Sequence, residues 1–294
     1  MKDVLKDIYI GVDGGATKSI IRIEDAAGNL LGREISGPAN IRISVEQSWL
    51  AIMSGINKIF SNLNITSIQE QINIHVGMGL AGCEMISAYE QFINSPHGFK
   101  NLYVTTDAHI ACLGAHAGHD GEIIIIGTGV VGFKIQSQQI TKVGGWGFPH
   151  DDEGGGAWLG LEAIKFTLQC LDGRQKKTGL ADAIYKKFDN DLNRLVTWAN
   201  NANSTAFAEL APVVIDQLQA GDAYALQLMQ RAAEKIEKVN LALSPSSLPC
   251  TLIGGLAPFI ENFLSLALKK RLQPCQHLPD AGAIYLVRNH SGLL

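Results

Sequence analysis

Short apolar runs separated by glycine-containing turns open the chain. Runs of this length, bounded by turn residues, predict β-strands. The predicted strands are residues 8–12, 19–24 and 30–36. Apolar residues then recur at helical spacing over 44–60, where Gln47 follows Ser44 at the three-residue spacing of a helix N-terminal cap. The pattern therefore predicts three strands followed by an amphipathic helix.

Strands and helices alternate in the next part of the chain. Residues 72–77 and 102–105 are predicted strands with a helix between them, and a further helix is predicted from about 107 to 116. A run of strands followed by this alternation is typical of a mixed sheet covered by helices. The expected class is therefore α/β.

The opening pattern then starts again. Residues 122–136 form an apolar strand, a glycine turn and a second strand, and 139–143 supplies a third. The likeness to the first hairpin lies in architecture more than in residue identity. It predicts two related domains, residues 1–117 and 118–279, joined near 117–121.

The region after Gly154 is predominantly helical by its periodicity. The predicted helices are residues 157–171, 181–188, 191–199, 205–218 and 223–243. Near the end, an apolar run from Cys250 reaches Gly254 and Gly255 and then continues as a helix. We expect a strand that ends on this glycine pair.

Composition limits the kinds of partner and location. The chain has 294 residues, of which 46% are hydrophobic and 18% charged, and its net charge is −4. This gives no electrostatic reason to expect nucleic acid or an anionic membrane as a partner. The longest aliphatic run, residues 123–126, is far shorter than the roughly 20 residues of a membrane span. The charged start is unlike a signal peptide, so a cytoplasmic protein is expected.

The five cysteines are odd in number and are nowhere spaced as Cys-x-x-Cys. This spacing argues against a zinc or iron–sulfur site and predicts reduced thiols.

Three glycine turns each follow a short apolar strand: Gly14-Gly15, Gly127-Thr128-Gly129 and Gly254-Gly255. Glycine lets the backbone approach a bulky anion and direct its N–H groups at it. None of the turns has the Gly-Lys-Ser/Thr sequence of a P-loop or the Gly-x-Gly-x-x-Gly of a dinucleotide-binding fold. The turns therefore predict a phosphate clamp made of two opposed hairpins.

The same turns resemble the motifs of the superfamily of sugar kinases, actin and heat-shock ATPases. Asp13-Gly-Gly-Ala-Thr17 is similar to its first phosphate motif, Gly127-Thr128-Gly129 to the second, and Ile253-Gly-Gly-Leu256 to its adenosine motif. Their order and domain-scale spacing span nearly the whole chain. The resemblance implies a two-domain actin-like ATPase fold with ribonuclease H-like domains and ATP in the cleft between them. It also implies that residues 280–294 return as a helix packed on the first domain.

The resemblance further implies how ATP and Mg²⁺ are held. Asp13 would orient Mg²⁺, through water, and Thr17 would bind the terminal phosphates. Lys18 could add positive charge, although a solvent-facing strand lysine is an equal alternative. The residues implied in ATP binding are Gly14, Gly15, Ala16, Thr17, Lys18, Gly127, Thr128, Gly129, Gly254, Gly255 and Leu256.

Asp107 stands where a predicted strand meets a predicted helix. An aspartate there is either a helix N-cap or a cleft-facing general base, and the local residues favour neither. Thr105-Thr106-Asp107 resembles the Thr-Thr-Asp or Thr-Asp-Asp of N-acetylglucosamine and glucosamine kinases, which implies the base. The nearby His109, His116 and His119 lack a carboxylate or cysteine partner, so we expect them on the helix surface.

Residues 143–158 place a tryptophan between glycines and then a cluster of acids. A structural turn with an acidic cap is the alternative to a functional loop. The run resembles the Gly-Gly-Trp-Gly…Asp-Glu-Gly-Ser loop of N-acetylglucosamine kinases, and Gly-Gly-Trp-Gly-Phe-Pro resembles bacterial glucosamine kinases. The residues that the resemblance implies in sugar binding are Asn40, Asp107, Gly145, Trp146, Gly147 and Asp152. Asn40 could instead be a plain turn residue.

Two positions depart from the family pattern. Val130 and Val131 stand where the family usually has serine and then a polar or small residue, so a side-chain hydrogen bond is lost there. Residues 154–156 are all glycine where a small hydroxyl residue is usual. Neither change removes a residue with an expected catalytic role.

These features predict an ATP- and Mg²⁺-dependent kinase that phosphorylates the 6-hydroxyl of glucosamine, with N-acetylglucosamine as the alternative acceptor. A sugar sensor on the same scaffold would need a DNA-binding arm, for which the start of the chain leaves no room, or a lost base. An activator ATPase of a redox enzyme would need a cysteine-ligated cluster. The expected partners are the sugar and ATP. The resemblance is to a family whose members are often dimers, but the sequence leaves open whether this chain is a monomer or a homodimer.

Overall fold

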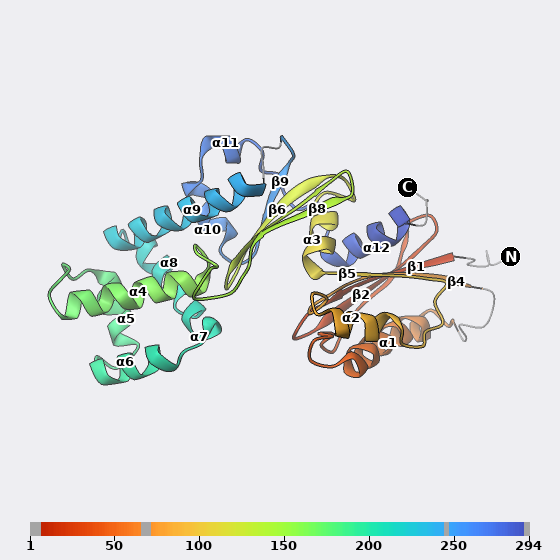
Figure 1. Cartoon of the computed structure of the whole chain (residues 1–294), viewed down its shortest axis with the longest axis horizontal. Coiled ribbons are helices and arrows are strands. Elements are labelled where there is room, and N and C mark those ends of the chain that lie inside the picture. The colour runs from red at the N-terminus through yellow and green to blue at the C-terminus, as the bar shows by residue number, and fades with distance from the viewer. Residues whose placement is uncertain (1–6, 66–71, 244–246, 291–294) are drawn as a thin grey trace. The chain divides into compact units, whose positions relative to one another are not determined.

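A computed structural model describes residues 7–65, 72–243 and 247–290 (Figure 1). The described residues fall into two compact units. The first unit comprises Met1–Gly121, Ile135–Gln139 and Pro274–Leu294, and the second comprises Glu122–Lys134 and Ile140–Gln273. Each unit is built on its own β-sheet.

The first sheet runs in the order β3-β2-β1-β4-β5. Its strands are β1 (Asp7–Gly14), β2 (Ser19–Asp25), β3 (Leu30–Ser36), β4 (Asn73–Leu80) and β5 (Asn101–Thr105). β1, β2 and β3 are antiparallel neighbours, whereas β1, β4 and β5 are parallel. The predicted strands and the mixed sheet are confirmed.

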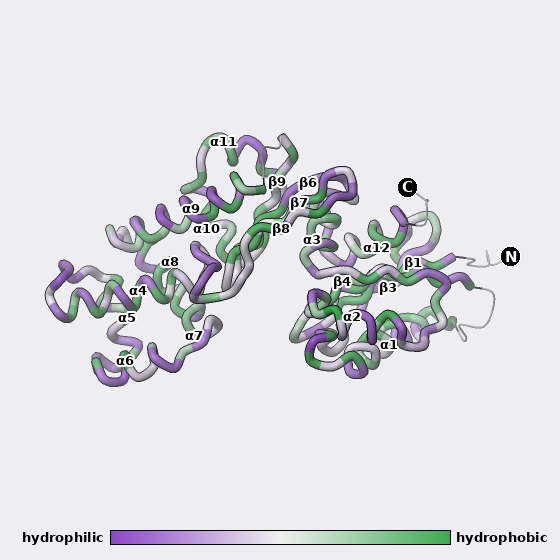
Figure 2. Tube along the Cα trace, in the orientation of Figure 1, coloured by the Kyte–Doolittle hydropathy of each residue, from purple (hydrophilic) through white to green (hydrophobic). Residues whose placement is uncertain are grey.

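Helices α1 (Val45–Asn62) and α2 (Ile86–Ile93) cover one face of this sheet (Figure 1). The predicted N-cap of α1 is confirmed, because the Ser44 hydroxyl accepts a hydrogen bond from the Gln47 N–H at 3.1 Å. The rings of Trp49 and Phe92 stack at 4.4 Å and join the two helices. In Figure 2, hydrophobic residues predominate along the central strands of each sheet.

Helices α3 (Asp107–Ala115) and α12 (Pro279–His290) lie on the other face (Figure 1). Glycines on the strands allow α12 to approach closely. A Cβ on Gly77 would lie 2.0 Å from the Ala283 carbonyl oxygen, and one on Gly11 would lie 2.1 Å from the Asp280 carbonyl oxygen. The buried Asp280 carboxylate accepts a hydrogen bond from Arg33 Nε at 2.7 Å. The C-terminal helix is therefore an integral layer of the first unit.

The second sheet runs in the order β8-β7-β6-β9. Its strands are β6 (Gly121–Ile126), β7 (Val130–Gln136), β8 (Gln139–Gly144) and β9 (Cys250–Ile253). β6 and β9 are parallel. The buried Glu122 carboxylate at the start of β6 pairs with Arg271, so this charge is compensated.

Helices make up most of the second unit, as predicted. They are α4 (Gly156–Leu171), α5 (Gly179–Lys186), α6 (Leu192–Asn201), α7 (Ser204–Ala208), α8 (Ala211–Gln219), α9 (Ala223–Leu243), α10 (Ala257–Ile260), the 3-10 helix η1 (Glu261–Phe263) and α11 (Leu266–Lys269). The prediction of one helix over 205–218 was wrong, since α7 ends before α8 begins. Pro212 lies in the first turn of α8, where proline is tolerated, whereas a helix running through it would lose a hydrogen bond.

The five cysteines all lie in the described residues, and none of them is in a disulfide. Within 7–65, 72–243 and 247–290, no helix combines the length and the apolar character that crossing a membrane requires.

The close contact of α12 with β4 generates a stability prediction. Gly77→Ala places a methyl group against a backbone carbonyl, which cannot move aside as a side chain can. We expect the free energy of unfolding, measured by urea denaturation, to fall by about 1–3 kcal/mol. In the control Gly37→Ala, the new Cβ would lie 3.5 Å from Ala51 Cβ, an ordinary contact. Equal stability of the two variants would contradict the packing of α12.

Candidate active site

The carboxyl ends of β1, β4 and β5 meet at one edge of the first sheet. Asp13 on β1 is aligned with Gly79 on β4, and Gly79 is aligned with Thr105 on β5. Ligands of open α/β sheets bind at this end of parallel strands. The register therefore gathers the predicted metal residue and the start of α3 at the edge where a ligand is expected.

The turn after β1 is held by its own backbone. The Gly15 N–H donates to the Lys18 carbonyl at 3.0 Å, and the Gly14 and Gly15 carbonyls accept from the N–H groups of Ala81 at 2.8 Å and Ala39 at 3.0 Å. The side chains of residues 16–18 are exposed. The main chain of the turn is thus anchored, while its tip faces solvent.

Asp13 lies in a site that disfavours negative charge. Burial, followed by the negative charges of Asp107 and Asp280, raises the pKa of Asp13 to about 6, against the opposing effect of Lys18 and Arg33. In the described part of the chain, no group of three or more His, Cys, Asp or Glu side chains is arranged to hold a metal. Mg²⁺ commonly takes only one or two carboxylates from the protein and completes its shell with phosphates and water. Asp13, with the charge of Asp107 nearby, therefore fits a Mg²⁺ ion.

Asp107 is the first residue of α3, not its cap. The N-cap is Thr106, whose hydroxyl accepts a hydrogen bond from the His109 N–H at 3.3 Å. The N-cap alternative for Asp107 was therefore wrong. Its exposed carboxylate accepts from the Ala108 N–H at 2.8 Å.

Two of the three nearby histidines are not on the surface, contrary to expectation. His116 is buried, and His109 lies largely buried with Nδ1 2.8 Å from the Thr105 hydroxyl. Burial lowers the pKa of His109 to about 4. Because α3 packs between β4 and α12, both of its sides are covered. His119, after the helix, is exposed as expected.

Asn40 lies beside the end of β4. It forms a β-bridge with Ala81, and its side-chain oxygen accepts a hydrogen bond from the Arg42 N–H at 3.1 Å. Its carbonyl accepts from the N–H groups of Ile43 and Ser44. Asn40 thus shapes a turn, and its contact with a sugar remains a prediction.

The second glycine turn follows β6 in the second unit. The Gly127 N–H donates to the Gly129 carbonyl at 3.0 Å. The first N–H groups of α4 hold this turn by hydrogen bonds. The Gly156 N–H donates to the Gly127 carbonyl at 2.8 Å, and the Ala157 N–H donates to the Thr128 carbonyl at 2.9 Å. The turn is therefore built onto the amino end of α4.

The loop between β8 and α4 carries the predicted sugar residues Gly145, Trp146, Gly147 and Asp152. Gly145 and Gly147 have positive φ values of 72° and 101°, which favour glycine. The Trp146 side chain is 82% exposed, and its backbone N–H donates to Asp151 Oδ2 at 3.0 Å. The structure thus presents an aromatic surface to solvent on a turn held by Asp151.

Val130 and Val131, which depart from the family pattern, differ in environment. The Val130 side chain is buried, so this residue offers the site only its backbone. Val131 lies against the loop that carries Trp146, since a Cβ built on Gly145 would be 3.1 Å from Val131 Cβ. Both valines therefore support the two loops by packing.

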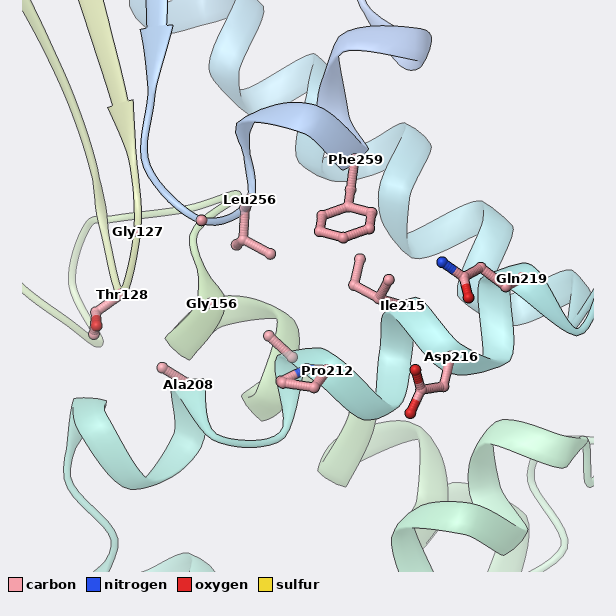
Figure 3. A pocket seen from close by; sticks show the side chains of 12 residues that line it. Gly127, Thr128, Gly156, Ala208, Pro212, Ile215, Asp216, Gln219, Leu256 and Phe259 are labelled. Carbon is pink, nitrogen blue, oxygen red and sulfur yellow. The ribbon is translucent and has the colours of Figure 1, made fainter.

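A cavity of about 480 Å³ opens beside the glycine turns of the second unit (Figure 3). Its lining residues are Gly127, Thr128, Gly156, Ala208, Ala211, Pro212, Ile215, Asp216, Gln219, Gly255, Leu256 and Phe259. In Figure 3, Thr128 lies at one side and Asp216 and Gln219 lie at the other. Apolar walls with a few polar groups are typical of small-molecule sites.

The sequence prediction missed much of this wall. Pro212, Ile215, Asp216 and Gln219 share one face of α8 at helical spacing, and Phe259 belongs to α10. The periodicity was visible, but it does not distinguish a face that lines a cavity from one that packs in the core.

Comparisons with known proteins agree with this architecture. Residues 10–258 match the model of the BadF/BadG/BcrA/BcrD ATPase family. The chain is 33% identical to glucosamine kinase GspK of Vibrio cholerae over 87% of each chain. It is 28% identical to an N-acetylmuramic acid/N-acetylglucosamine kinase of Clostridium acetobutylicum, over 77% of this chain and 76% of the relative.

A solved Chromobacterium violaceum structure, provisionally named N-acetylglucosamine kinase, is 31% identical with a TM-score of 0.82, covering 95% of this chain and 98% of that one. The ROK hexokinase of Thermus thermophilus is 17% identical with a TM-score of 0.53 over 97% and 99% of the chains, a likeness of fold. The predicted α/β fold of the two-domain actin-like ATPases is confirmed.

The environment of Asp13 predicts how stability varies with pH. The pKa of Asp13 is raised from 3.8 to about 6, so at pH 7 its ionised carboxylate lowers the free energy of unfolding. Asp13→Asn removes this destabilising charge. Without nucleotide or divalent cations, we expect the variant to be more stable by about 1–3 kcal/mol at pH 7. The gain should shrink as the pH falls from about 6 to about 4, because the folded wild type then binds a proton.

Urea denaturation at a series of pH values checks this expectation. Glu261→Gln, at an exposed carboxylate of η1, is the control and should change stability by less than about 0.5 kcal/mol at each pH. A stability difference for Asp13→Asn that does not vary with pH would contradict the raised pKa.

Proposed function

This chain belongs to the BadF/BadG/BcrA/BcrD ATPase family and is an ATP-dependent amino-sugar kinase, and we propose that its acceptor is the 6-hydroxyl of glucosamine. The observation that carries the choice of sugar is the 33% identity to glucosamine kinase GspK over 87% of both chains. N-acetylglucosamine is the alternative, favoured by the names of the relatives from Clostridium acetobutylicum and Dictyostelium discoideum.

The cavity of the second unit is the proposed adenosine site. Its apolar side chains, among them Ile215, Leu256 and Phe259, suit the faces of a purine, and Asp216 and Gln219 suit its polar edge. Gly255 lines the cavity and leaves room for the nucleoside, whereas Gly254 lets the backbone pass close to the Ile126 carbonyl oxygen, 2.3 Å from a Cβ built on it. Gly127 and Thr128 of the second glycine turn border the same cavity.

The proposed phosphate-binding groups of the first unit are the Thr17 hydroxyl, the Lys18 ammonium and the amides of the 14–18 turn other than that of Gly15, which donates to the Lys18 carbonyl. Asp13, whose pKa is raised by burial and then by the charges of Asp107 and Asp280, would hold Mg²⁺ through water. When bound, the ion supplies positive charge that offsets the charge on the transferring phosphoryl group. The residues of this turn orient the phosphates by backbone N–H groups that need no rearrangement.

Asp107 is the proposed general base. Phosphoryl transfer to an alcohol requires a group that takes the hydroxyl proton as the new O–P bond forms. Thr106, not Asp107, is the N-cap of α3, and the Asp107 carboxylate is exposed at the first residue of the helix. The proposed sugar contacts are Asn40, Gly145, Trp146, Gly147 and Asp152, with the exposed indole covering a C–H face of the ring.

Acceptor choice is tested by coupled ADP release with glucosamine, N-acetylglucosamine, glucose and N-acetylmannosamine. We expect the highest kcat/KM with glucosamine, and ³¹P and ¹³C NMR of the product should place the phosphate on the 6-oxygen. A higher kcat/KM with N-acetylglucosamine would replace the proposed acceptor. Absence of ADP release with every sugar would favour a sensor on the same scaffold.

The role of Asp107 is tested by Asp107→Asn. This change keeps the size of the side chain but removes the proton acceptor, so we expect kcat to fall at least about 100-fold. The affinity for ADP, measured by calorimetry, should stay within about twofold of wild type. The control is Glu46→Gln, which changes another exposed acid in the first turn of a first-unit helix and should leave kcat unchanged. Unchanged turnover in Asp107→Asn would exclude it as the base.

A further inference from the structure

The carboxylate of Asp152 lies against the phosphate turn of its own unit. A Cβ built on Gly129 would be 2.3 Å from Asp152 Cγ and 2.5 Å from both carboxylate oxygens. The Val130 N–H, directly after the turn, points to Asp152 Oδ1 at 3.4 Å. A residue expected to contact the sugar is therefore in direct contact with the backbone of the Gly127–Gly129 turn.

The backbone at Asp152 is arranged around this contact. Asp152 has a φ of 65°, in the left-handed region where glycine is most favourable and Asp or Asn is the usual exception. Its carbonyl accepts a hydrogen bond from the Gly155 N–H at 3.1 Å, and the next amide, Gly156, donates to the Gly127 carbonyl. Both the main chain and the side chain at 152 thus tie this loop to the phosphate turn.

An aspartate beside the Gly127–Gly129 turn cannot be there to attract phosphate. A carboxylate beside a turn that receives phosphates repels them, and burial, followed by the charge of Asp151, raises the pKa of Asp152. The side chain is nevertheless aimed at the Val130 N–H. Because the Val130 side chain is buried in the core, fixing its N–H fixes the end of the Gly127–Gly129 turn.

We infer that Asp152 is a positioning residue for the nucleotide: by accepting the Val130 N–H, it holds the Gly127–Gly129 turn in the form that binds phosphate. This role rests on the proposed function and is additional to the sugar contact of Asp152. It assigns one side chain to the binding of both substrates within the second unit.

Two substitutions separate the acceptor oxygen from the charge. Asp152→Gly removes the side chain and suits the left-handed backbone, so its fold should be preserved. Asp152→Asn keeps a side-chain oxygen and tolerates the same φ, but loses the charge. Affinity for ADP with Mg²⁺ is measured by calorimetry without sugar. We expect Asp152→Gly to weaken ADP binding about tenfold, and Asp152→Asn to bind ADP as tightly as wild type or more tightly.

Trp146→Ala is the matched control from the same loop. Its side chain is exposed, so this variant should raise the KM for glucosamine and leave ADP affinity unchanged. A double-mutant cycle adds a readout that general destabilisation would not move. Gly129→Ala places a methyl group against the Asp152 carboxylate, so it should weaken ADP binding more in the wild-type background than in Asp152→Gly.

The outcomes are distinguishable. Wild-type affinity in Asp152→Gly would overturn the inference, and so would a loss in Asp152→Asn equal to that in Asp152→Gly, since the neutral oxygen should suffice. Melting temperatures of all variants show whether a loss of ADP affinity follows from unfolding. If Asp152→Gly is unfolded, the ADP affinity of Asp152→Asn decides whether the side-chain oxygen positions the turn. Failure of the wild-type protein to bind ADP would instead overturn the proposed function.

Discussion

The site depends on main-chain hydrogen bonds that anchor the glycine turns at the ends of buried strands. In the first unit the Gly14 and Gly15 carbonyls are bound by Ala81 and Ala39, and in the second the Gly127 and Thr128 carbonyls are bound by the first amides of α4. A turn that receives phosphate must present N–H groups without side chains in the way, so it cannot be held by its own side chains. Neighbouring segments therefore hold it through its carbonyl oxygens.

Negative charge is the second constraint. Asp13 is mostly withdrawn from water among other acids, whereas the buried Asp280 is compensated by Arg33. An unpaired buried carboxylate destabilises the fold, and a bound cation relieves this cost. The acid paired with Arg33 supports α12, whereas Asp13, where burial and neighbouring acids outweigh Lys18 and Arg33, lies at the carboxyl ends of the parallel strands. Ionisation of Asp13 thus lowers the stability of the folded protein, a cost that the proposed Mg²⁺ would relieve.

Much of the fold could be predicted, since short apolar runs and glycine turns are local features. The strand over 30–36 and the helix over 223–243 have their predicted bounds, and Ser44 is the cap that its spacing with Gln47 indicated. The single helix over 205–218 was wrong because Pro212 has no N–H to donate within a continuous helix and instead lies in the first turn of α8. The burial of His109 and His116 was missed because it depends on how α3 and the residues after it pack on other elements, which local periodicity does not show.

By itself the sequence determined the elements and the glycine turns, because each is encoded in residues close together in the chain, and it determined the family through the order and spacing of the glycine motifs. Tertiary structure decided what those residues contact. It showed that Thr106, not Asp107, caps α3, that α8 and α10 supply a wall of the cavity, and that Asp152 reaches the Val130 amide. The cavity wall and the Asp152 contact join residues distant in the chain, and burial and pKa shifts arise only once the elements have packed together.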